Sequence, residues 1–342
     1  MFRAARIAFA LALFTGAAGA QEASDTGGGD LAPALVAPIL DYDFDAPESL
    51  SAPVPYAPEG DPPAALLAGE LHELVLEVRL APEHDPLRDG VMWRVFASRS
   101  GEAGELPVVA EAQGGTVTVQ LPSGDYLVHA AFGRAGATKR VTVADDDQME
   151  SLVLDAGGMK LDSVVGADVP IPPENLTLEV MQEDENGDLV TIVPNAVPGR
   201  VLRLSAGTYH VISRYGGVNA VVRADIEVEP GKLTEAVMRH AGAEITLKLV
   251  AEAGGEALAN TSWTVITQDG NTVHESIGAF PSIILATGDY TAVAAHQDNI
   301  YSRDFTVEAG IERDIEVRLA DLVRPEPPPA GLAGAAERPM EP

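Results

Sequence analysis

The chain contains no cysteine, which excludes disulfide bonds, a cysteine nucleophile and the attachment of a lipid to a cysteine. Each folded domain must therefore be held together by its hydrophobic core alone, which is feasible at about 80 residues. Lysine is also scarce, with 4 residues against 18 arginines. Together with the many Ala, Gly and Pro residues, this composition is typical of a bacterial protein from a GC-rich genome.

Positive charge is in short supply as well. Lys and Arg number 22 against 52 Asp and Glu, which leaves a formal net charge of −30. Nucleic acids and anionic membranes are bound through basic surfaces, so we expect the chain to bind neither. The acidic surface is interpreted as a source of solubility, and divalent-cation binding is the alternative.

Long apolar runs are missing beyond the N-terminus. The first 20 residues have the layout of a signal peptide: Arg3 and Arg6, an apolar stretch at 7–14, and small residues at 18–20. No later stretch approaches the roughly 20 apolar residues that a membrane helix needs. The sequence therefore predicts a periplasmic or extracellular protein, cleaved near Ala20 and not inserted in a membrane.

Catalytic and cofactor motifs are absent too. The seven histidines occur singly, without metal-ligand spacing, and no nucleophile elbow, P-loop or dinucleotide fingerprint occurs. His129 and His210 occupy nearly equivalent strand positions and are predicted to point away from the core. We therefore predict a protein that is not an enzyme and has no cofactor, with calcium as the one alternative.

What the chain does contain is a signature, Leu-x-x-Gly-x-Tyr, which occurs three times, at 121–126, 204–209 and 285–290. The tyrosines are 83 and 81 residues apart, which is the length of one small β-domain. The glycine suits a tight turn. The tyrosine ring is predicted to pack inward while its hydroxyl reaches a backbone group at the rim, as in a tyrosine corner.

Alternating patterns around the signature predict short strands. Leu74, Leu76 and Val78 alternate with polar or exposed positions, and 245–249 repeats the pattern. Trp93 and Trp263 occupy equivalent strand positions, which favours core packing over sugar stacking. About seven strands per 80 residues predict an all-β protein of three tandem antiparallel β-sandwich domains (Ig-like or prealbumin-like) in an elongated array with disordered tails.

The sequence divides into six predicted segments. Pro, Gly and acidic residues dominate the stretches between the signal peptide and the first repeat and after the last repeat, which predicts disorder there. The segments are a signal peptide at 1–20, an acidic Ala/Pro/Gly-rich spacer at 21–68, β-sandwich repeats at 69–157, 158–241 and 242–322, and a Pro-rich tail at 323–342.

The repeats resemble the carboxypeptidase regulatory-like and Cna-B-like modules, which have a transthyretin-type sandwich. The stretch 121–128 carries their typical phrase L-P-x-G-x-Y-x-V, and 229–231 and 308–310 match a later glycine turn. The first repeat has Asp145–Asp147 in place of that turn. The resemblance covers 69–322 and implies a non-catalytic accessory, stalk or binding role.

One acidic loop is a candidate metal site. Asp184, Asn186 and Asp188 have the alternate spacing of oxygen ligands in calcium loops. The glycine and the residue at position 12 depart from that pattern, so an Asn-Gly hairpin turn is the favoured interpretation. Asp145–Asp147 is a second acidic turn of the same kind.

These observations predict an exported bacterial envelope protein that serves as a structural spacer or as a scaffold binding a protein or cell-wall glycan. A calcium-stabilised adhesin or matrix protein and an accessory module of a secreted hydrolase are the alternatives. The partner's identity, the choice between periplasm and medium, and the oligomeric state are left open by the sequence.

Overall fold

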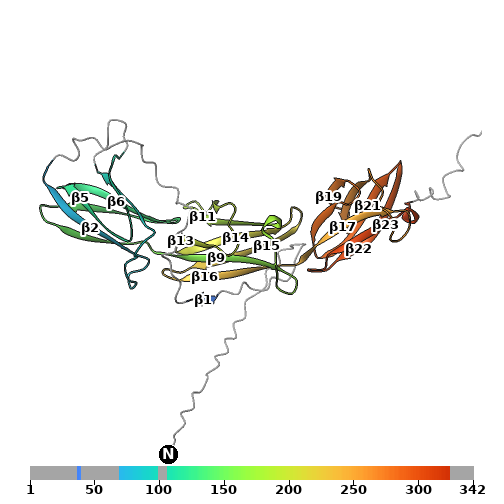
Figure 1. The fold of residues 1–342 in the computed structure, drawn as a ribbon, viewed down its shortest axis with the longest axis horizontal. Helices are drawn as coiled ribbons and strands as arrows, with labels where there is room; N and C mark the ends of the chain where they lie inside the picture. Colours follow the sequence, from blue (N-terminus) through green and yellow to red (C-terminus); the bar gives the residue numbers. More distant parts are fainter. Residues whose placement is uncertain (1–36, 40–68, 99–105, 324–342) are drawn as a thin grey trace, which may run out of the picture. The chain divides into compact units, whose positions relative to one another are not determined.

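The computed structural model describes residues 37–39, 69–98 and 106–323. Nearly all of this part of the chain is β-structure, and its only helices are two short 3-10 turns, η2 (Pro173–Asn175) and η3 (Leu319–Asp321). Figure 1 shows three groups of strands along the sequence, here called the first, second and third units. Among the described residues, no helix is long and apolar enough to cross a membrane.

The first unit is a sandwich of a three-stranded sheet, β5-β2-β8, and a four-stranded sheet, β4-β3-β6-β7. Its strands are β2 (Leu71–Arg79), β3 (Met92–Ala97), β4 (Val108–Gln113), β5 (Thr116–Pro122), β6 (Gly124–Phe132), β7 (Ala135–Val143) and β8 (Gln148–Val153).

The second unit repeats this plan, with sheets β1-β16-β9-β10, in which β13 also pairs with β9, and β12-β11-β14-β15. Its strands are β9 (Ala156–Val165), β10 (Val169–Pro170), β11 (Leu176–Glu183), β12 (Leu189–Val193), β13 (Val201–Ser205), β14 (Gly207–Tyr215), β15 (Ala220–Val228) and β16 (Leu233–His240), joined by β1 (Ala37–Ile39) from far upstream.

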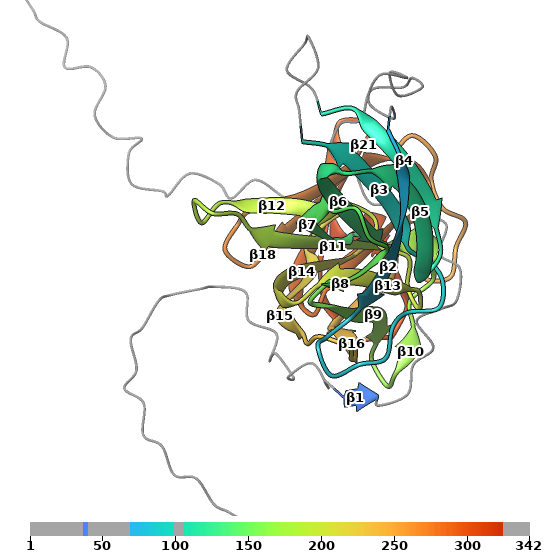
Figure 2. The ribbon, with the colours of Figure 1, turned by 90° about the vertical axis from the view of Figure 1, so that its left-hand side faces the viewer.

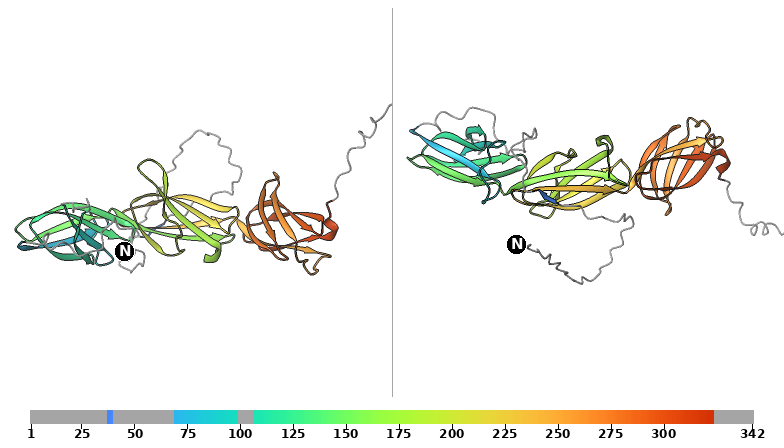
Figure 3. Two further views of the ribbon diagram at one scale, coloured as in Figure 1. Left: turned by 90° about the horizontal axis from the view of Figure 1, so that it is seen from above. Right: turned by 60° about the horizontal axis from the view of Figure 1, so that its bottom comes forward.

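The third unit has sheets β20-β17-β23 and β19-β18-β21-β22. Its strands are β17 (Gly242–Val250), β18 (Ser262–Thr267), β19 (Thr272–Ile277), β20 (Ser282–Ala286), β21 (Gly288–His296), β22 (Asn299–Val307) and β23 (Arg313–Arg318). Figure 3 shows the paired sheets of each unit from two further directions.

Apolar side chains from alternate strand positions fill each sandwich, as the period of two requires. In the first unit the predicted inward row Leu74, Leu76 and Val78 is fully buried. Trp93 and Trp263 are at most 1% exposed, and each indole Nε1 donates to a backbone oxygen, of Gly114 (2.8 Å) and of Gly278 (3.0 Å). The prediction of tandem β-sandwiches is confirmed, and the tryptophans are core residues.

One pairing was not predicted. In each unit the last strand returns beside the first and runs parallel to it, as β8 beside β2, β16 beside β9 and β23 beside β17, while the other pairs are antiparallel. A parallel pair needs a long crossover, and here the intervening strands of both sheets supply it. Alternation along a strand gives no direction for its neighbour, so the sequence could not reveal this pair.

The structure describes three residues of the predicted spacer, and they form β1, which pairs antiparallel with β16 beside it (Figures 1 and 2). The signal peptide, the rest of the spacer, the turn predicted around Gly101 and most of the Pro-rich tail lie outside the described residues. The domain boundaries that the sequence indicates stay a prediction.

Candidate functional site

The three signature tyrosines form the predicted corners. Each ring is at most 5% exposed, and each hydroxyl donates to the carbonyl oxygen four residues before it. The pairs are Tyr126 with Pro122 (2.8 Å), Tyr209 with Ser205 (2.9 Å) and Tyr290 with Ala286 (3.0 Å). The signature therefore closes the turn between the strands it joins, and burial raises the pKa of Tyr209 to about 12.

The predicted calcium residues lie in the hairpin turn between β11 and β12. The Asp184 carboxylate accepts the backbone N–H groups of Asn186 (2.8 Å) and Asp188 (2.9 Å), and these bonds lower its pKa. The Gly187 N–H completes the turn on the Asp184 carbonyl oxygen at 3.0 Å. The Asp184 carboxylate thus has hydrogen-bond donors inside its own turn. Calcium binding by Asp184, Asn186 and Asp188 stays a prediction.

The two strand histidines lie on the outer face of their sheets, as predicted. His129 Nδ1 lies 2.9 Å from Thr138 Oγ1, and His210 Nδ1 lies 2.5 Å from Asp225 Oδ1. Partial burial, and to a lesser degree Arg94, lowers the pKa of His129. Among the described residues, no group of three His, Cys, Asp or Glu side chains is placed to hold a metal ion.

A buried polar chain that the sequence did not reveal crosses the second unit. Ser163 Oγ lies 3.0 Å from Ser213 Oγ, which lies 2.6 Å from His240 Nε2, and all three residues are at most 4% exposed. Burial lowers the pKa of His240 to about 4, against a smaller opposing contribution from the Ala220 backbone. The imidazole is therefore neutral at pH 7 and serves as an internal hydrogen-bonding group.

The first and second units meet around a buried arginine. Arg203 on β13 is 5% exposed, and its guanidinium lies over the Phe132 ring, 4.4 Å from the centroid. Its carbonyl oxygen accepts the Arg134 N–H at 2.9 Å. Gly133 has a φ of +62°, and a Cβ there would lie 2.6 Å from the Arg203 Cβ, so only glycine fits this turn.

The second and third units meet through the same positions. Gly216 is the counterpart of Gly133 in the following repeat, and a Cβ there would lie 2.6 Å from the Ile284 Cβ. Ile284, like Arg203, directly precedes the signature leucine. Asn219 adds two hydrogen bonds, since its Nδ2 donates to the Tyr290 hydroxyl (2.8 Å) and its Oδ1 accepts the Ala286 N–H (2.9 Å).

A second contact also recurs at both junctions. The His84 ring packs directly on Gly231, and Gly166 approaches Gly310 so closely that an added Cβ would lie 3.2 Å from the other glycine's Cα. Gly231 and Gly310 end the glycine turns noted in the sequence. The residues beside the signature and those of the glycine turn therefore have two roles: they shape their own unit and they contact the neighbouring one.

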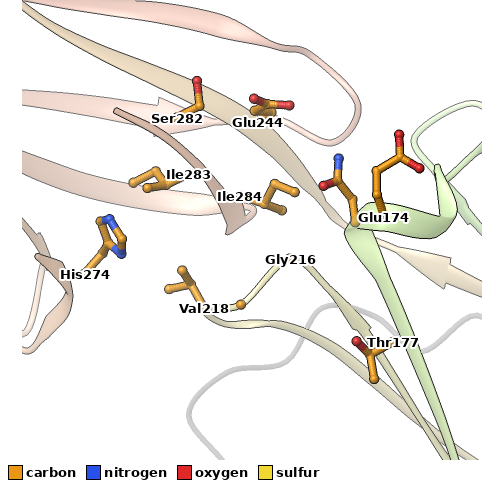
Figure 4. Close-up of a pocket in the computed structure, with 11 residues that line it drawn as sticks. Glu174, Thr177, Gly216, Val218, Glu244, His274, Ser282, Ile283 and Ile284 are labelled. Atoms are coloured by element: carbon orange, nitrogen blue, oxygen red, sulfur yellow. The ribbon is translucent and has the colours of Figure 1, made fainter. Parts of the chain in front are cut away.

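A cleft of about 560 Å³ opens at the second junction (Figure 4). Ile283, Ile284 and Val218 supply its apolar surface, and Glu174, Glu244 and His274 stand at its walls. Burial raises the pKa of Tyr215 nearby, and Glu312 and Glu244 add to the effect, so the local potential is negative. The arrangement suits contact with a cationic or neutral group.

Sequence reasoning missed the residues that join the units. The signal was present in part, since the position before the signature leucine is Gln120 in the first repeat but Arg203 and Ile284 in the next two. Only the repeats that follow another unit carry a residue there that packs against it. Asn219 had no such signal, because its partners lie 67 and 71 residues away.

Solved structures similar to this chain include the Bacillus anthracis TIE protein and two pilins. The Bacillus anthracis TIE protein is 15% identical, and the match covers 73% of this chain and 50% of that chain, with a TM-score of 0.23. The minor pilin GBS52 of Streptococcus agalactiae is 16% identical over 49% of this chain and 95% of its own, with a TM-score of 0.29. The major pilin subunit BcpA of Bacillus cereus is 10% identical over 73% and 99%, with a TM-score of 0.19.

No curated protein matches the chain. A family model does match one part of it, and that part is the third unit. Residues 244–319 match the Rhizobiales growth-associated tandem repeat domain.

Proposed function

We propose that this protein is an exported, non-enzymatic scaffold of the bacterial cell envelope, which holds a binding surface for another envelope protein or a cell-wall glycan. The observation that carries the proposal is the repeated junction. Gly133 against Arg203 and Gly216 against Ile284 join successive units through equivalent positions. Sandwiches with filled cores and dedicated joints suit a protein that holds partners at fixed positions.

The family match supports the envelope role from a separate direction. The matched domain is described as a growth-associated tandem repeat, and a growing envelope is where a spacer or scaffold of repeated sandwiches would act. The acidic composition of the chain, with its net charge of −30, favours neutral or basic partners over anionic ones.

The test is a pull-down of the chain, tagged at its C-terminus, from the envelope fraction of cells that naturally express it, with calcium and with chelator. One stoichiometric protein or glycan partner in both conditions is expected. An unrelated exported acidic protein with the same tag controls for charge. Recovery of the chain in the cytosolic fraction, or a partner-free envelope pool, would overturn the proposal, and recovery only with calcium would instead support the calcium-stabilised adhesin.

A further inference from the structure

The three units carry different residues at one equivalent strand position, on the strand that contacts the last strand of each unit. The signature tyrosines pair with Val141, Ile226 and Phe305 on the neighbouring strand, which aligns β7, β15 and β22. Two residues earlier these strands carry Lys139, Ala224 and Arg303. The first and third units therefore have a long cation where the second has alanine.

The two cations cover backbone groups of the last strand in their units. Lys139 Nζ donates to the Ser151 carbonyl oxygen on β8 at 3.1 Å, and it also pairs with Glu150 at 2.8 Å. The Arg303 guanidinium donates to the Glu316 carbonyl oxygen on β23. A cation on a sheet edge discourages the pairing of another strand there.

The corresponding carbonyl group in the second unit is that of Val237. Ser151 pairs with Glu77, Glu316 with Lys248 and Val237 with Asp162. Glu77, Lys248 and Asp162 are equivalent positions, because each lies five residues after the one that pairs with the signature leucine of its unit. The residues that pair with the leucines are His72, Ala243 and Gly157. With Ala224 at the equivalent position, no cation covers this carbonyl from β15.

This uncovered edge is the one that carries an added strand. β1 pairs antiparallel with β16, with Ala37, Pro38 and Ile39 opposite Glu235, Thr234 and Leu233. β1 has only three residues, and its central proline lacks the N–H group that a ladder hydrogen bond requires. β16 continues to His240, and none of the residues that the structure describes pairs with the stretch 236–240 on this side.

We propose that the outer edge of β16 is a docking site for an extended strand of a partner protein, which adds to the sheet antiparallel, in the direction that β1 follows. The partner strand is longer than β1, reaches past Val237 and is neutral or basic, because the chain is strongly acidic. β1 occupies part of the site and yields to the longer strand, whose additional backbone hydrogen bonds favour it. The proposal names the binding surface of the proposed scaffold and rests on that function for its partner.

The test is a titration of the full chain with a fluorescein-labelled peptide, Lys-Thr-Val-Thr-Val-Thr-Val-Lys, followed by anisotropy. Ala224→Lys installs the cation of the other units and is expected to weaken binding at least tenfold, whereas the matched control Ala224→Leu leaves it unchanged. The double variant Ala37→Pro, Ile39→Pro removes the β1 N–H groups and is expected to tighten binding about tenfold. Hydrogen exchange over 236–240 is expected to slow when the peptide binds.

The complementary variant is Lys139→Ala, which uncovers the edge of the first unit and is expected to raise the stoichiometry from one peptide to two. Equal binding to Ala224→Lys and Ala224→Leu, or equal binding of a peptide with proline at two central positions, overturns the proposal. The titration uses purified protein and a synthetic strand. A failed titration therefore refutes only the docking of a strand on β16, while a failed envelope pull-down refutes only the scaffold function.

Discussion

At the scale of single residues, the tyrosine corner separates the contribution of one hydroxyl from that of the ring beneath it. Tyr209→Phe keeps the buried ring and removes the bond to the Ser205 carbonyl oxygen. We expect a loss of about 1–2 kcal/mol in the free energy of unfolding, because a partly buried acceptor then lacks its donor. Urea unfolding measures it.

The matched control is Tyr301→Phe, since Tyr301 is also buried but its hydroxyl makes no hydrogen bond to the residues that the structure describes. Equal losses in the two variants would show that the ring environment, and not the corner bond, determines the effect.

His240 makes the stability of the second unit depend on pH. Burial lowers its folded-state pKa to about 4, below the ordinary value of 6.5, so the unfolded chain binds a proton more readily. The free energy of unfolding that depends on the neutral His240 imidazole is fully present above pH 6.5. It is lost as the pH falls to about 4, and the total loss is about 3 kcal/mol. His240→Gln, which cannot titrate, should have a flatter profile over that range.

The measurement compares the free energies of unfolding of the wild type and His240→Gln at pH 7 and pH 4.5. Both proteins share every carboxylate, so the difference between their slopes isolates the imidazole. Parallel slopes would mean that His240 accepts a proton without disturbing its contacts with Ser213 and Tyr215.

At the scale of elements, the β11–β12 turn is expected to be independent of calcium. The Asp184 carboxylate already accepts two backbone N–H groups of its own turn, so a cation would have to compete with them. The melting temperature should be the same with calcium and with chelator. A chelator-sensitive melting curve that becomes insensitive in Asp184→Asn would establish the calcium site instead.

The junction between the second and third units depends on one amide side chain. Asn219→Ala removes both of its bonds to the third unit and should cost about 1–3 kcal/mol, since a part-buried Ala286 N–H loses its acceptor. It should also separate the unfolding of the two units in calorimetry. Asn299→Ala is the control, because the Asn299 side chain donates within its own turn, to Gln297, and bonds to no other residue that the structure describes.

The strands and the corners could be predicted from sequence because their causes are local. Alternation placed Leu74, Leu76 and Val78 inside, and the repeated glycine and tyrosine identified the turn. The junctions could not be predicted in this way. Arg203 and Asn219 contact residues of another unit, and a single sequence does not reveal which distant positions meet.

At the scale of the whole molecule, charge is the dominant property. With a net charge of −30, the acidic side chains of the folded chain repel one another. Dissolved ions screen this repulsion beyond about 10 Å at 0.1 M salt. We expect the melting temperature to rise between 10 mM and 300 mM sodium chloride. Sucrose at equal osmolarity is the control, and a melting temperature that falls with salt would show that the ion pairs outweigh the repulsion.

The two tryptophans make intrinsic fluorescence sensitive to two of the three units. Trp93 lies in the core of the first unit and Trp263 in that of the third, and the second unit has none. Indole fluorescence therefore reports the opening of the two outer units, while the middle one is silent. A shift of emission that precedes the loss of β-structure in circular dichroism would single out the second unit as the last to unfold, without any label.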